Sequence, residues 1–383
     1  MPNTKHTFDV AIIGSGPAGA TAAFELAKNG LSTVIIEKEF LPRYKTCGGG
    51  LVHRGRKLLP FDITAVVEKE FHEVTVQVNQ TQLATQREEP IITMVMRDTF
   101  DELIIKKAQE HGVTVLQGHK VLGIDFGAQQ SITTSEATLQ ATFIIAADGA
   151  LSPIAKMAGW KETRTLIPAL EYEIEVPMAD FNRLSQTVRF DVDAIPFGYG
   201  WCFPKKNHLS VGVAVLSTKH KKIDLKAYYR EYLIQLGITT ITKEAAHGFV
   251  IPISARTDGF VKNKVFLIGD AAGFADPLVA EGISNAILSG TLVAEAIAES
   301  NCDAELAGVL YQQKLEVALL PEIKTGALLS KLFYEQKRFR NLLVPKYGQA
   351  FAEAMTDLFL GKRTYPTDYK AAINRKVKAM IFK

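Results

Sequence analysis

The glycine-rich turn at residues 14–19 restricts the fold of this 383-residue chain more than any other feature. The turn reads Gly-Ser-Gly-Pro-Ala-Gly and follows a short apolar run at 8–13. An alanine-rich stretch at 20–28 comes next and ends at Asn29-Gly30, a common helix stop. With a second apolar run at 31–37, the order predicts a strand, tight turn, helix and strand that bind a dinucleotide.

Each glycine of this turn has a separate expected role. Gly14 permits the tight turn, Gly16 lets backbone N–H groups approach a diphosphate, and Gly19 lets the helix pack against the strand. Pro17 and Ala18 complete the turn. An anion placed there is stabilised by the unpaired N–H groups and the dipole at the N-terminus of the helix.

The acidic residue at the end of the second strand fits the same site. Glu37 lies 18 residues beyond Gly19 and is placed to accept hydrogen bonds from the ribose hydroxyls of an adenosine. A carboxylate there disfavours a 2′-phosphate. We include its neighbour Lys38 in the predicted site.

A second glycine-acid pair distinguishes FAD from NAD. Gly269-Asp270 follows the apolar run 264–268, and a carboxylate at a strand end is suited to a ribityl hydroxyl of FAD. The long apolar helix expected from Gly282 and Ile283 to residue 299 directs its N–H groups toward the flavin pyrimidine edge. Alternatively, Asp270 is a simple helix cap.

The remaining patterns predict an α/β fold. It combines a Rossmann-like FAD/NAD(P)-binding three-layer domain, an inserted antiparallel β-sheet substrate domain and a helical C-terminus. Strand-like alternation covers 73–96 and several segments between 161 and 215. A helix is expected at 99–111, capped by Asp98 or Thr99, and strands at 113–124 and 141–147. We expect FAD-binding segments at 1–70, 97–160 and 250–300, substrate-domain segments at 71–96 and 161–249, and a helical region at 301–383.

Composition excludes several classes of function. A net charge of +3 is too weak to indicate nucleic acid binding. The three cysteines are few, odd in number and without C-x-x-C spacing, so we predict neither a metal site nor a disulfide framework. The same sparse count favours a reducing compartment. The N-terminus has no apolar signal-peptide core and the chain has no 18-residue apolar run, so we predict a cytoplasmic protein. Any membrane contact would be peripheral. The basic tail after Asp368 either binds an anionic lipid surface or is simply solvated.

Several motifs together resemble the para-hydroxybenzoate hydroxylase superfamily of flavoproteins. They are the turn at 14–19, the pair at 269–270, and the segment 147–152, which resembles the central Asp-Gly motif of that group through Asp148 and Gly149. Arg97, followed by Phe-Asp-x-Leu at 100–103, resembles the arginine that helps to hold FAD in that fold. Val121 is added to the predicted FAD contacts. Lys156 departs from the pattern, because many members have an arginine there.

Three segments resemble the geranylgeranyl reductase family more specifically: 42–51, 199–205 and 269–285. The resemblance implies reduction of isolated carbon–carbon double bonds in polyprenyl chains, with FAD carrying the hydride. It implies a prenyl lipid or prenyl diphosphate as substrate, and NAD(P)H or reduced ferredoxin as electron donor. It also places the loop with Cys47, Gly48 and Gly49 near the isoalloxazine.

Four residues are candidates for the chemistry itself. Tyr199, Trp201 and Phe203 alternate on an expected strand, so they face one side and form an aromatic wall that contacts the isoprenoid and stabilises positive charge. Ordinary sheet packing is the alternative. Cys47 is a proton donor, a redox partner, a shaping residue, or a small residue without chemistry. Arg43 and Lys45 flank this loop, and the same two alternatives apply to both. Each attracts a phosphate group, or each is a solvated loop charge.

Two other functions are compatible with these motifs. One is a flavin-dependent monooxygenase or halogenase on the same scaffold, and the stretch 199–204 has a faint likeness to the tryptophan motif of halogenases. The other is an electron-transfer flavoprotein that passes electrons to a quinone. Oligomeric state does not follow from the sequence.

Overall fold

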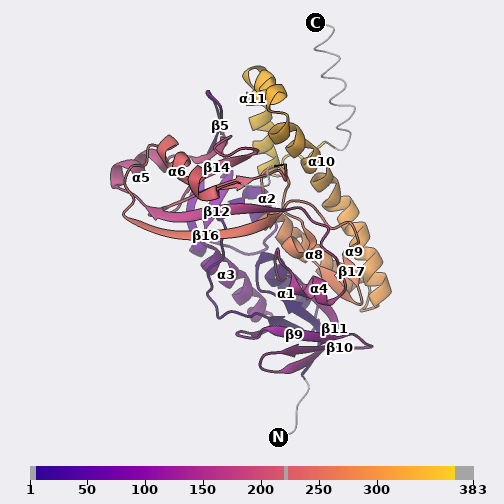
Figure 1. The fold of residues 1–383 in the computed structure, drawn as a ribbon. Coiled ribbons are helices and arrows are strands. Elements are labelled where there is room, and N and C mark those ends of the chain that lie inside the picture. Colours follow the sequence, from indigo (N-terminus) through magenta and orange to yellow (C-terminus); the bar gives the residue numbers. More distant parts are fainter. Residues whose placement is uncertain (1–5, 220–222, 367–383) are drawn as a thin grey trace, which may run out of the picture.

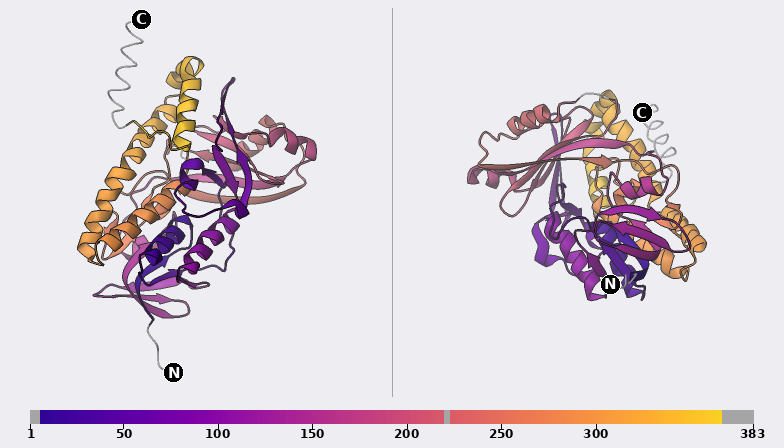
Figure 2. Two further views of the ribbon diagram at one scale, coloured as in Figure 1. Left: turned by 180° about the vertical axis from the view of Figure 1, so that it is seen from behind. Right: turned by 60° about the horizontal axis from the view of Figure 1, so that its bottom comes forward.

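The computed structural model describes residues 6–219 and 223–366, which form two principal sheets surrounded by helices. Figure 1 shows the first sheet in the lower half, with β9, β10 and β11, and the large sheet above it. The orange and yellow helices α9 to α11 run along one side of both, as the views in Figure 2 also show. The expected fold class is confirmed; the domain boundaries stay a prediction.

The first sheet is built around β1 (His6–Ile13), which pairs in parallel with β2 (Thr33–Ile36) and β11 (Thr138–Ala146). Parallel strands covered on both faces are apolar throughout, and Ile12, Ile35 and Ile144 are fully buried. The other strands are β8 (Thr114–Leu116), β9 (Val121–Asp125), β10 (Gln130–Thr134), β17 (Val261–Lys262) and β18 (Val265–Leu267).

Helix α1 (Pro17–Lys28) packs against α8 (Ile283–Glu299) and α3 (Arg97–Glu110). The predicted cap of α3 is wrong: the helix begins at Arg97 after Met96, without a side-chain cap. A helical backbone from residue 97 lets Arg97 and Asp101 meet at i, i+4 spacing, and their ion pair lies inside the first turns.

The large sheet has seven strands in the order β16, β12, β15, β14, β13, β5, β6. All neighbours are antiparallel except β13 and β5, which are parallel, so the expected antiparallel sheet is in fact mixed. The strands are β16 (Lys243–Pro252), β12 (Leu166–Glu175), β15 (Leu209–Val215), β14 (Gly198–Pro204), β13 (Val188–Val192), β5 (Glu73–Val78) and β6 (Thr81–Gln86).

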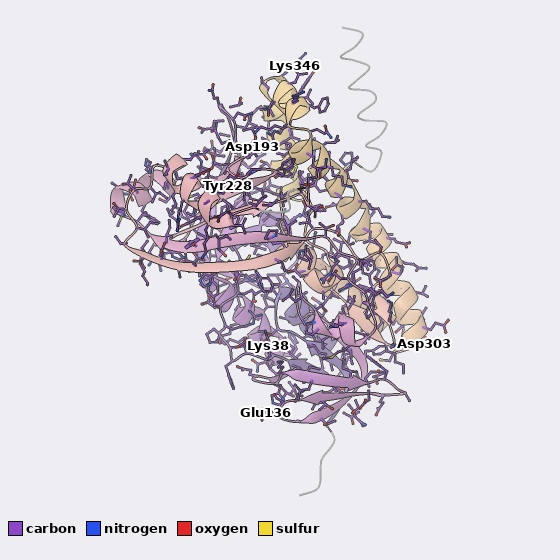
Figure 3. The ribbon with its side chains drawn as sticks, in the orientation of Figure 1. Lys38, Glu136, Asp193, Tyr228, Asp303 and Lys346 are labelled. Atoms are coloured by element: carbon purple, nitrogen blue, oxygen red, sulfur yellow. The ribbon has the colours of Figure 1, made fainter. Side chains whose placement is uncertain are left out.

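Both faces of the large sheet are covered. On one face, α6 (Leu225–Gln235) and α5 (Met178–Leu184) bury Cys202 and its neighbours. On the other face, α11 (Lys337–Phe359) packs against β6 and shares a core with Tyr199 and Trp201. In Figure 3, the large sheet lies between two labelled residues, Tyr228 of α6 above it and Lys38 below it, near the first sheet.

A small third sheet joins the two larger ones. It contains β3 (Gly50–Val52), β7 (Ile92–Val95) and β4 (Val67–Phe71). The alternating segment 73–96 is therefore divided, because its last strand β7 pairs with β3 and β4 and not with the large sheet. The short helices here are α2 (His53–Arg56) and a 3-10 turn at Thr64–Val66.

The C-terminal part is largely helical between Ala304 and Phe359. Helices α9 (Ala304–Ala318) and α10 (Leu320–Ser330) lead through a π-helical turn at Lys331–Glu335 into α11. The basic tail after Asp368 lies outside the described residues. Within the described ranges, no helix combines the length and apolar character needed to cross a membrane.

Candidate functional site

One cavity of about 1250 Å³ lies where the first sheet, the loop 42–49 and the large sheet meet. Pockets for single drug-sized ligands are about 300–1000 Å³, so this space is larger than one such ligand needs. Among the sequence-predicted residues, those that line it are Gly14, Gly16, Pro17, Ala18, Glu37, Lys38, Cys47, Gly48, Gly49, Arg97, Val121, Asp148, Gly149, Tyr199, Trp201, Phe203, Asp270, Gly282 and Ile283. Gly19 and Gly269 do not line it and lie just behind it.

The turn before α1 opens directly into the cavity. Gly14 has a φ of 103°, and a Cβ there would lie 2.7 Å from the carbonyl carbon of Ala147. Gly16 is the N-cap of α1 and has no side-chain cap, so the first N–H groups of the helix are left for a ligand. A Cβ on Gly19 would overlap the carbonyl oxygen of Gly14, which agrees with the packing role expected for it.

Glu37 is 4% exposed and is held by the turn itself. The backbone N–H and hydroxyl of Ser15 donate to its Oε2 at 3.0 and 2.5 Å, and the N–H of Glu39 donates to Oε1 at 3.1 Å. Burial raises the pKa of Glu37, but the Ser15 hydroxyl, Arg43 and the two N–H groups lower it below its usual value. The carboxylate is therefore ionised at the end of β2, beside the uncapped helix.

Two arginines next to this turn form ion pairs with the same buried carboxylate, that of Asp101. Arg97 donates to both oxygens of Asp101 at 2.8 and 2.9 Å, and Arg43 donates to Asp101 Oδ2 at 3.0 Å. The guanidinium groups of Arg43 and Arg97 each lie 3.9 Å from the Cβ position of Gly16. Arg43 is thus fixed by ion pairs beside the turn, and both cations favour an anion there.

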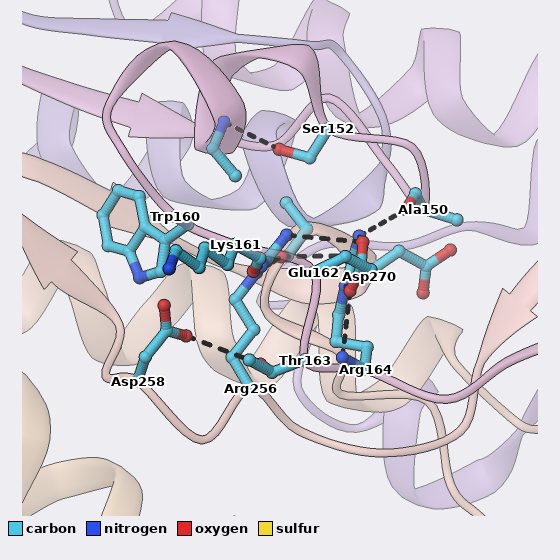
Figure 4. Close-up of polar contacts among 12 residues, drawn as sticks. Ala150, Ser152, Trp160, Lys161, Glu162, Thr163, Arg164, Arg256, Asp258 and Asp270 are labelled. Atoms are coloured by element: carbon cyan, nitrogen blue, oxygen red, sulfur yellow. Dashed lines mark hydrogen bonds and ion pairs between the residues drawn. The ribbon is translucent and has the colours of Figure 1, made fainter.

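Asp270 is presented by a short, well-anchored turn, α7 (Gly269–Ala272), after β18. Arg164 donates to the backbone oxygens of Asp270 and Ala271 and, at 2.7 Å, to that of Ala150, while Arg256 Nε donates to Ala271 at 2.9 Å. Figure 4 shows Arg164 next to Asp270, with a dashed line that marks its hydrogen bond to Ala150. Burial raises the pKa of Asp270, and Lys45, Arg97 and Arg164 oppose that rise.

The carboxylate of Asp148 accepts hydrogen bonds from residues of the turn that follows it. The Ser152 hydroxyl donates to Oδ1 at 2.6 Å and the Ile154 N–H to Oδ2 at 2.9 Å, at the start of α4 (Pro153–Met157). Gly149 has a φ of 85°, and nothing lies within 4 Å of its Cβ position. The Asp-Gly pair therefore shapes a turn whose backbone borders the cavity.

The glycines after Cys47 are required by protein contacts. A Cβ on Gly48 would lie 2.8 Å from the Phe203 ring, and one on Gly49, which has a φ of 67°, would overlap the Val95 carbonyl and Lys205 Nζ. The backbone of this loop therefore lies directly against Phe203 and Lys205 of the large sheet and against Val95 of β7. The Gly49 N–H donates to Cys47 Sγ at 3.4 Å.

The three rings of the predicted aromatic wall lie side by side, and a fourth ring joins them; contact with a substrate stays a prediction. The rings of Tyr199, Trp201 and Phe203 follow each other on β14 with centroids 6.2 and 6.3 Å apart. Phe190 of β13 joins them, 5.8 Å from Tyr199 and 5.1 Å from Phe203. The Tyr199 hydroxyl is held by the Val279 carbonyl at 2.7 Å. Phe190 was not foreseen, although it lies in an alternating segment.

Glu171 of β12 is a second lining residue that the sequence did not reveal. It is 1% exposed and lies beside the aromatic wall. Burial, and less strongly the negative charge of Glu173, raise the pKa of Glu171 to about 7, although the Ser210 hydroxyl, Lys205 and the Cys47 N–H lower it. Glu171 is therefore a buried carboxyl group that takes up and releases its proton near neutral pH.

Comparison with known proteins agrees with this geometry. The FAD binding domain family matches residues 7–304. The chain is 31% identical to the chloroplastic geranylgeranyl diphosphate reductase of Arabidopsis thaliana, over 95% of this chain and 84% of that protein.

Solved structures show the same fold. A geranylgeranyl bacteriochlorophyll reductase-like protein from Thermoplasma acidophilum superposes with a TM-score of 0.74 at 24% identity, covering 85% of this chain and 87% of the other. A flavin-dependent brominase has a TM-score of 0.72 at 22% identity, covering 97% and 100%. An uncapped glycine turn, an ionised acid beside it and a second acid at the far strand end fit FAD, and with the sequence match they establish that the chain belongs to the geranylgeranyl reductase family of FAD-binding oxidoreductases.

Proposed function

We propose that this protein reduces carbon–carbon double bonds of polyprenyl chains with a hydride supplied by bound FAD. The observation that carries the proposal is that the same cavity is lined both by the dinucleotide turn and by the aromatic wall. An apolar chain beside the wall would therefore lie next to the flavin.

The residues that would hold FAD follow from their positions. The N–H groups at Gly16 to Ala18 would bind the diphosphate, with Arg43 and Arg97 nearby, and Glu37 would bind the adenosine ribose. Asp270 would bind the ribityl chain, and the N-terminus of α8 at Gly282 and Ile283 would face the flavin. When bound, FAD supplies the two electrons of the reduction as a hydride.

The large sheet would provide the dry, shaped half of the site. An unactivated alkene is a poor hydride acceptor, so hydride transfer needs protonation in step and gives the alkene carbocation character. The faces of Tyr199, Trp201 and Phe203 would stabilise that positive charge. Since these rings are buried among Phe190, Val279 and Phe359, water has little access to them.

The natural substrate, electron donor and location form the finer part of the proposal. We propose a prenyl lipid or prenyl diphosphate as substrate, and NAD(P)H or reduced ferredoxin as donor. A cytoplasmic protein in peripheral contact with a membrane suits a lipid substrate, because a long isoprenoid is delivered most directly from a bilayer surface.

The test is anaerobic reduction by the FAD-loaded enzyme. Photoreduced protein is mixed with geranylgeranyl diphosphate, a geranylgeranyl ether lipid and a prenyl quinone, and the products are read by mass. We expect a gain of two hydrogen atoms per reduced bond without oxygen. Products that are hydroxylated or brominated, and formed only with oxygen, would establish the monooxygenase or halogenase alternative. Quinone head-group reduction with intact prenyl double bonds would establish the electron-transfer alternative.

A further inference from the structure

A buried carboxyl group lies in the same row of the large sheet as the aromatic wall. Glu171 of β12 is paired with Gly212 of β15, and Gly212 is paired with Trp201 of β14. Residues that face each other across neighbouring strands point to the same side of the sheet. Glu171 and Trp201 therefore stand on the face that borders the cavity, and both line it.

The glycine between them allows the two side chains to approach each other. A Cβ on Gly212 would lie 2.5 Å from Cη2 of the Trp201 indole, which is far inside van der Waals contact. The indole thus lies across β15, over the position where any other residue would carry a side chain. The aromatic wall extends by this means to the strand that carries Glu171.

A hydrogen-bonded chain fixes one oxygen of Glu171. The indole N–H of Trp201 donates to the Ser210 hydroxyl at 3.3 Å, and that hydroxyl donates to Glu171 Oε1 at 2.5 Å. The other oxygen, Oε2, is buried and has no hydrogen bond of normal geometry among the described residues, although the Cys47 N–H lies close enough to the carboxyl to lower its pKa. A carboxylate with a buried, unpaired oxygen is costly, whereas a carboxylic acid carries its own hydrogen there.

Several charged and titratable groups surround the carboxyl group of Glu171. Across β16, His247 occupies the facing position, and the ring of Tyr44 stacks on it with centroids 4.0 Å apart. The charged and titratable groups around the carboxyl are Glu173, Lys205, His208, His247, Tyr44, Lys45 and Cys47. His208 pairs with Glu173 at 3.0 Å, and Lys205 donates to two backbone carbonyls.

We propose that Glu171 is the general acid that protonates the substrate double bond, an inference that rests on the proposed function. In this step the hydride of reduced FAD forms a C–H bond with one alkene carbon. The O–H bond of Glu171 breaks, and its proton forms a C–H bond with the other alkene carbon. The alkene is reduced, the flavin is oxidised, and the Glu171 carboxylate later regains a proton from water.

The central test is Glu171→Gln in the FAD-loaded protein. Glutamine keeps the shape and still accepts the hydrogen bond from Ser210, but it cannot release a proton. We expect unchanged FAD occupancy and an unchanged rate of flavin photoreduction. Alkene reduction in a single turnover should fall by about 100- to 10,000-fold, the usual contribution of a general acid. Glu175→Gln, at the half-exposed end of the same strand, is the matched control and should keep the wild-type rate.

A spectroscopic measurement tests the proton independently of turnover. The infrared difference spectrum between wild type and E171Q should contain the C=O band of a protonated carboxyl at neutral pH. That band should fade as pH rises through the pKa of Glu171, and the rate of alkene reduction should fall over the same range. Glu173→Gln removes a neighbouring negative charge, so both transitions should move to lower pH.

The outcomes separate the two proposals. If wild type reduces prenyl chains and E171Q does so equally fast, Glu171 is not the acid and the proposed function stands. If the band is absent at neutral pH although wild type is active, the inference is also wrong. If wild type reduces no prenyl chain, both proposals are wrong.

Discussion

Replacing Gly212 by alanine tests whether the indole of Trp201 really lies across β15. The new Cβ would stand 2.5 Å from Cη2 of the indole and 2.5 Å from the carbonyl oxygen of Leu170. Carbon atoms in optimal contact are about 3.5–4.0 Å apart, so the overlap is roughly 1 Å or more. The Leu170 oxygen belongs to the paired strand β12 and cannot move without disturbing the sheet. The indole must therefore give way.

Overpacking of a buried site costs about 1–3 kcal/mol, and the fixed Leu170 oxygen together with the displaced indole places G212A in the upper part of that range. A loss of about 2–3 kcal/mol lowers the folding equilibrium constant by roughly 30- to 150-fold. Gly248→Ala is the matched control, because it is also a strand glycine and its Cβ would meet only ordinary contacts at 3.7 Å. We expect it to change stability by less than about 0.5 kcal/mol.

The assay is urea unfolding followed by tryptophan fluorescence. The chain has two tryptophans, so Trp160→Phe leaves Trp201 as the reporter in both variants. G212A should unfold at lower urea than G248A, and its native emission should differ because the indole has moved. Equal midpoints and identical native spectra for the two variants would refute the packing described above.

Three further substitutions test the roles of cavity residues. Asp270→Ala should weaken FAD binding by roughly 10- to 100-fold, because it removes a charged hydrogen bond worth about 1.5–3 kcal/mol. The measurement is the visible flavin absorbance that the protein retains after gel filtration, and full retention would remove Asp270 from the FAD site. Trp201→Ala should slow prenyl reduction about tenfold while the flavin stays bound, because one face that stabilises positive charge is lost; an unchanged turnover rate argues against a wall in contact with substrate. Cys47→Ser should lose much less activity than E171Q in the same single-turnover assay, because Glu171 and not Cys47 supplies the proton; an equally large loss contradicts that assignment.

The nucleotide-binding half of the cavity could be predicted from the sequence because its requirements are local. Gly14 has a positive φ, and Gly19 packs against the carbonyl oxygen of Gly14, only five residues earlier in the chain. Glu37 follows from strand length, since β2 ends one residue before it. Such constraints act on single residue types at fixed spacing, so they are readable in one sequence. The anchoring arginines were missed because Arg164 is 106 residues from the turn at Asp270 that it holds.

The half of the cavity lined by the aromatic rings was less predictable, because it depends on pairing between distant strands. Alternating Glu171 and Glu173 in an apolar strand normally indicate a face that meets water. Here that face is closed by the loop 42–49, so the apparent polar face lies inside the protein. The signal that was available is Gly212, a strand glycine that indicates close approach of another group, but its partner Trp201 emerges only from the strand register.

Lys205 offers a last test, because its ammonium group joins the large sheet to the loop that covers Glu171. Its side chain is fully buried, and Nζ donates to the carbonyl oxygens of Gly48 at 2.6 Å and Val95 at 3.0 Å. Lys205→Met should leave both oxygens unpaired and lower the free energy of unfolding by about 1–3 kcal/mol or more. Lys206→Met, at the exposed neighbouring position, is the matched control and should have almost no effect.

The same variant has a second, opposite consequence for the proton. The charge of Lys205 lowers the pKa of Glu171, so its removal raises that pKa and keeps the acid protonated to higher pH. In the fraction of protein that folds and binds FAD, the fall of alkene reduction with pH should therefore move to higher pH in K205M, and to lower pH in E173Q. A less stable enzyme that works at higher pH is difficult to explain by structural damage alone. If both variants move the profile in one direction, or neither moves it, the group that titrates is not Glu171.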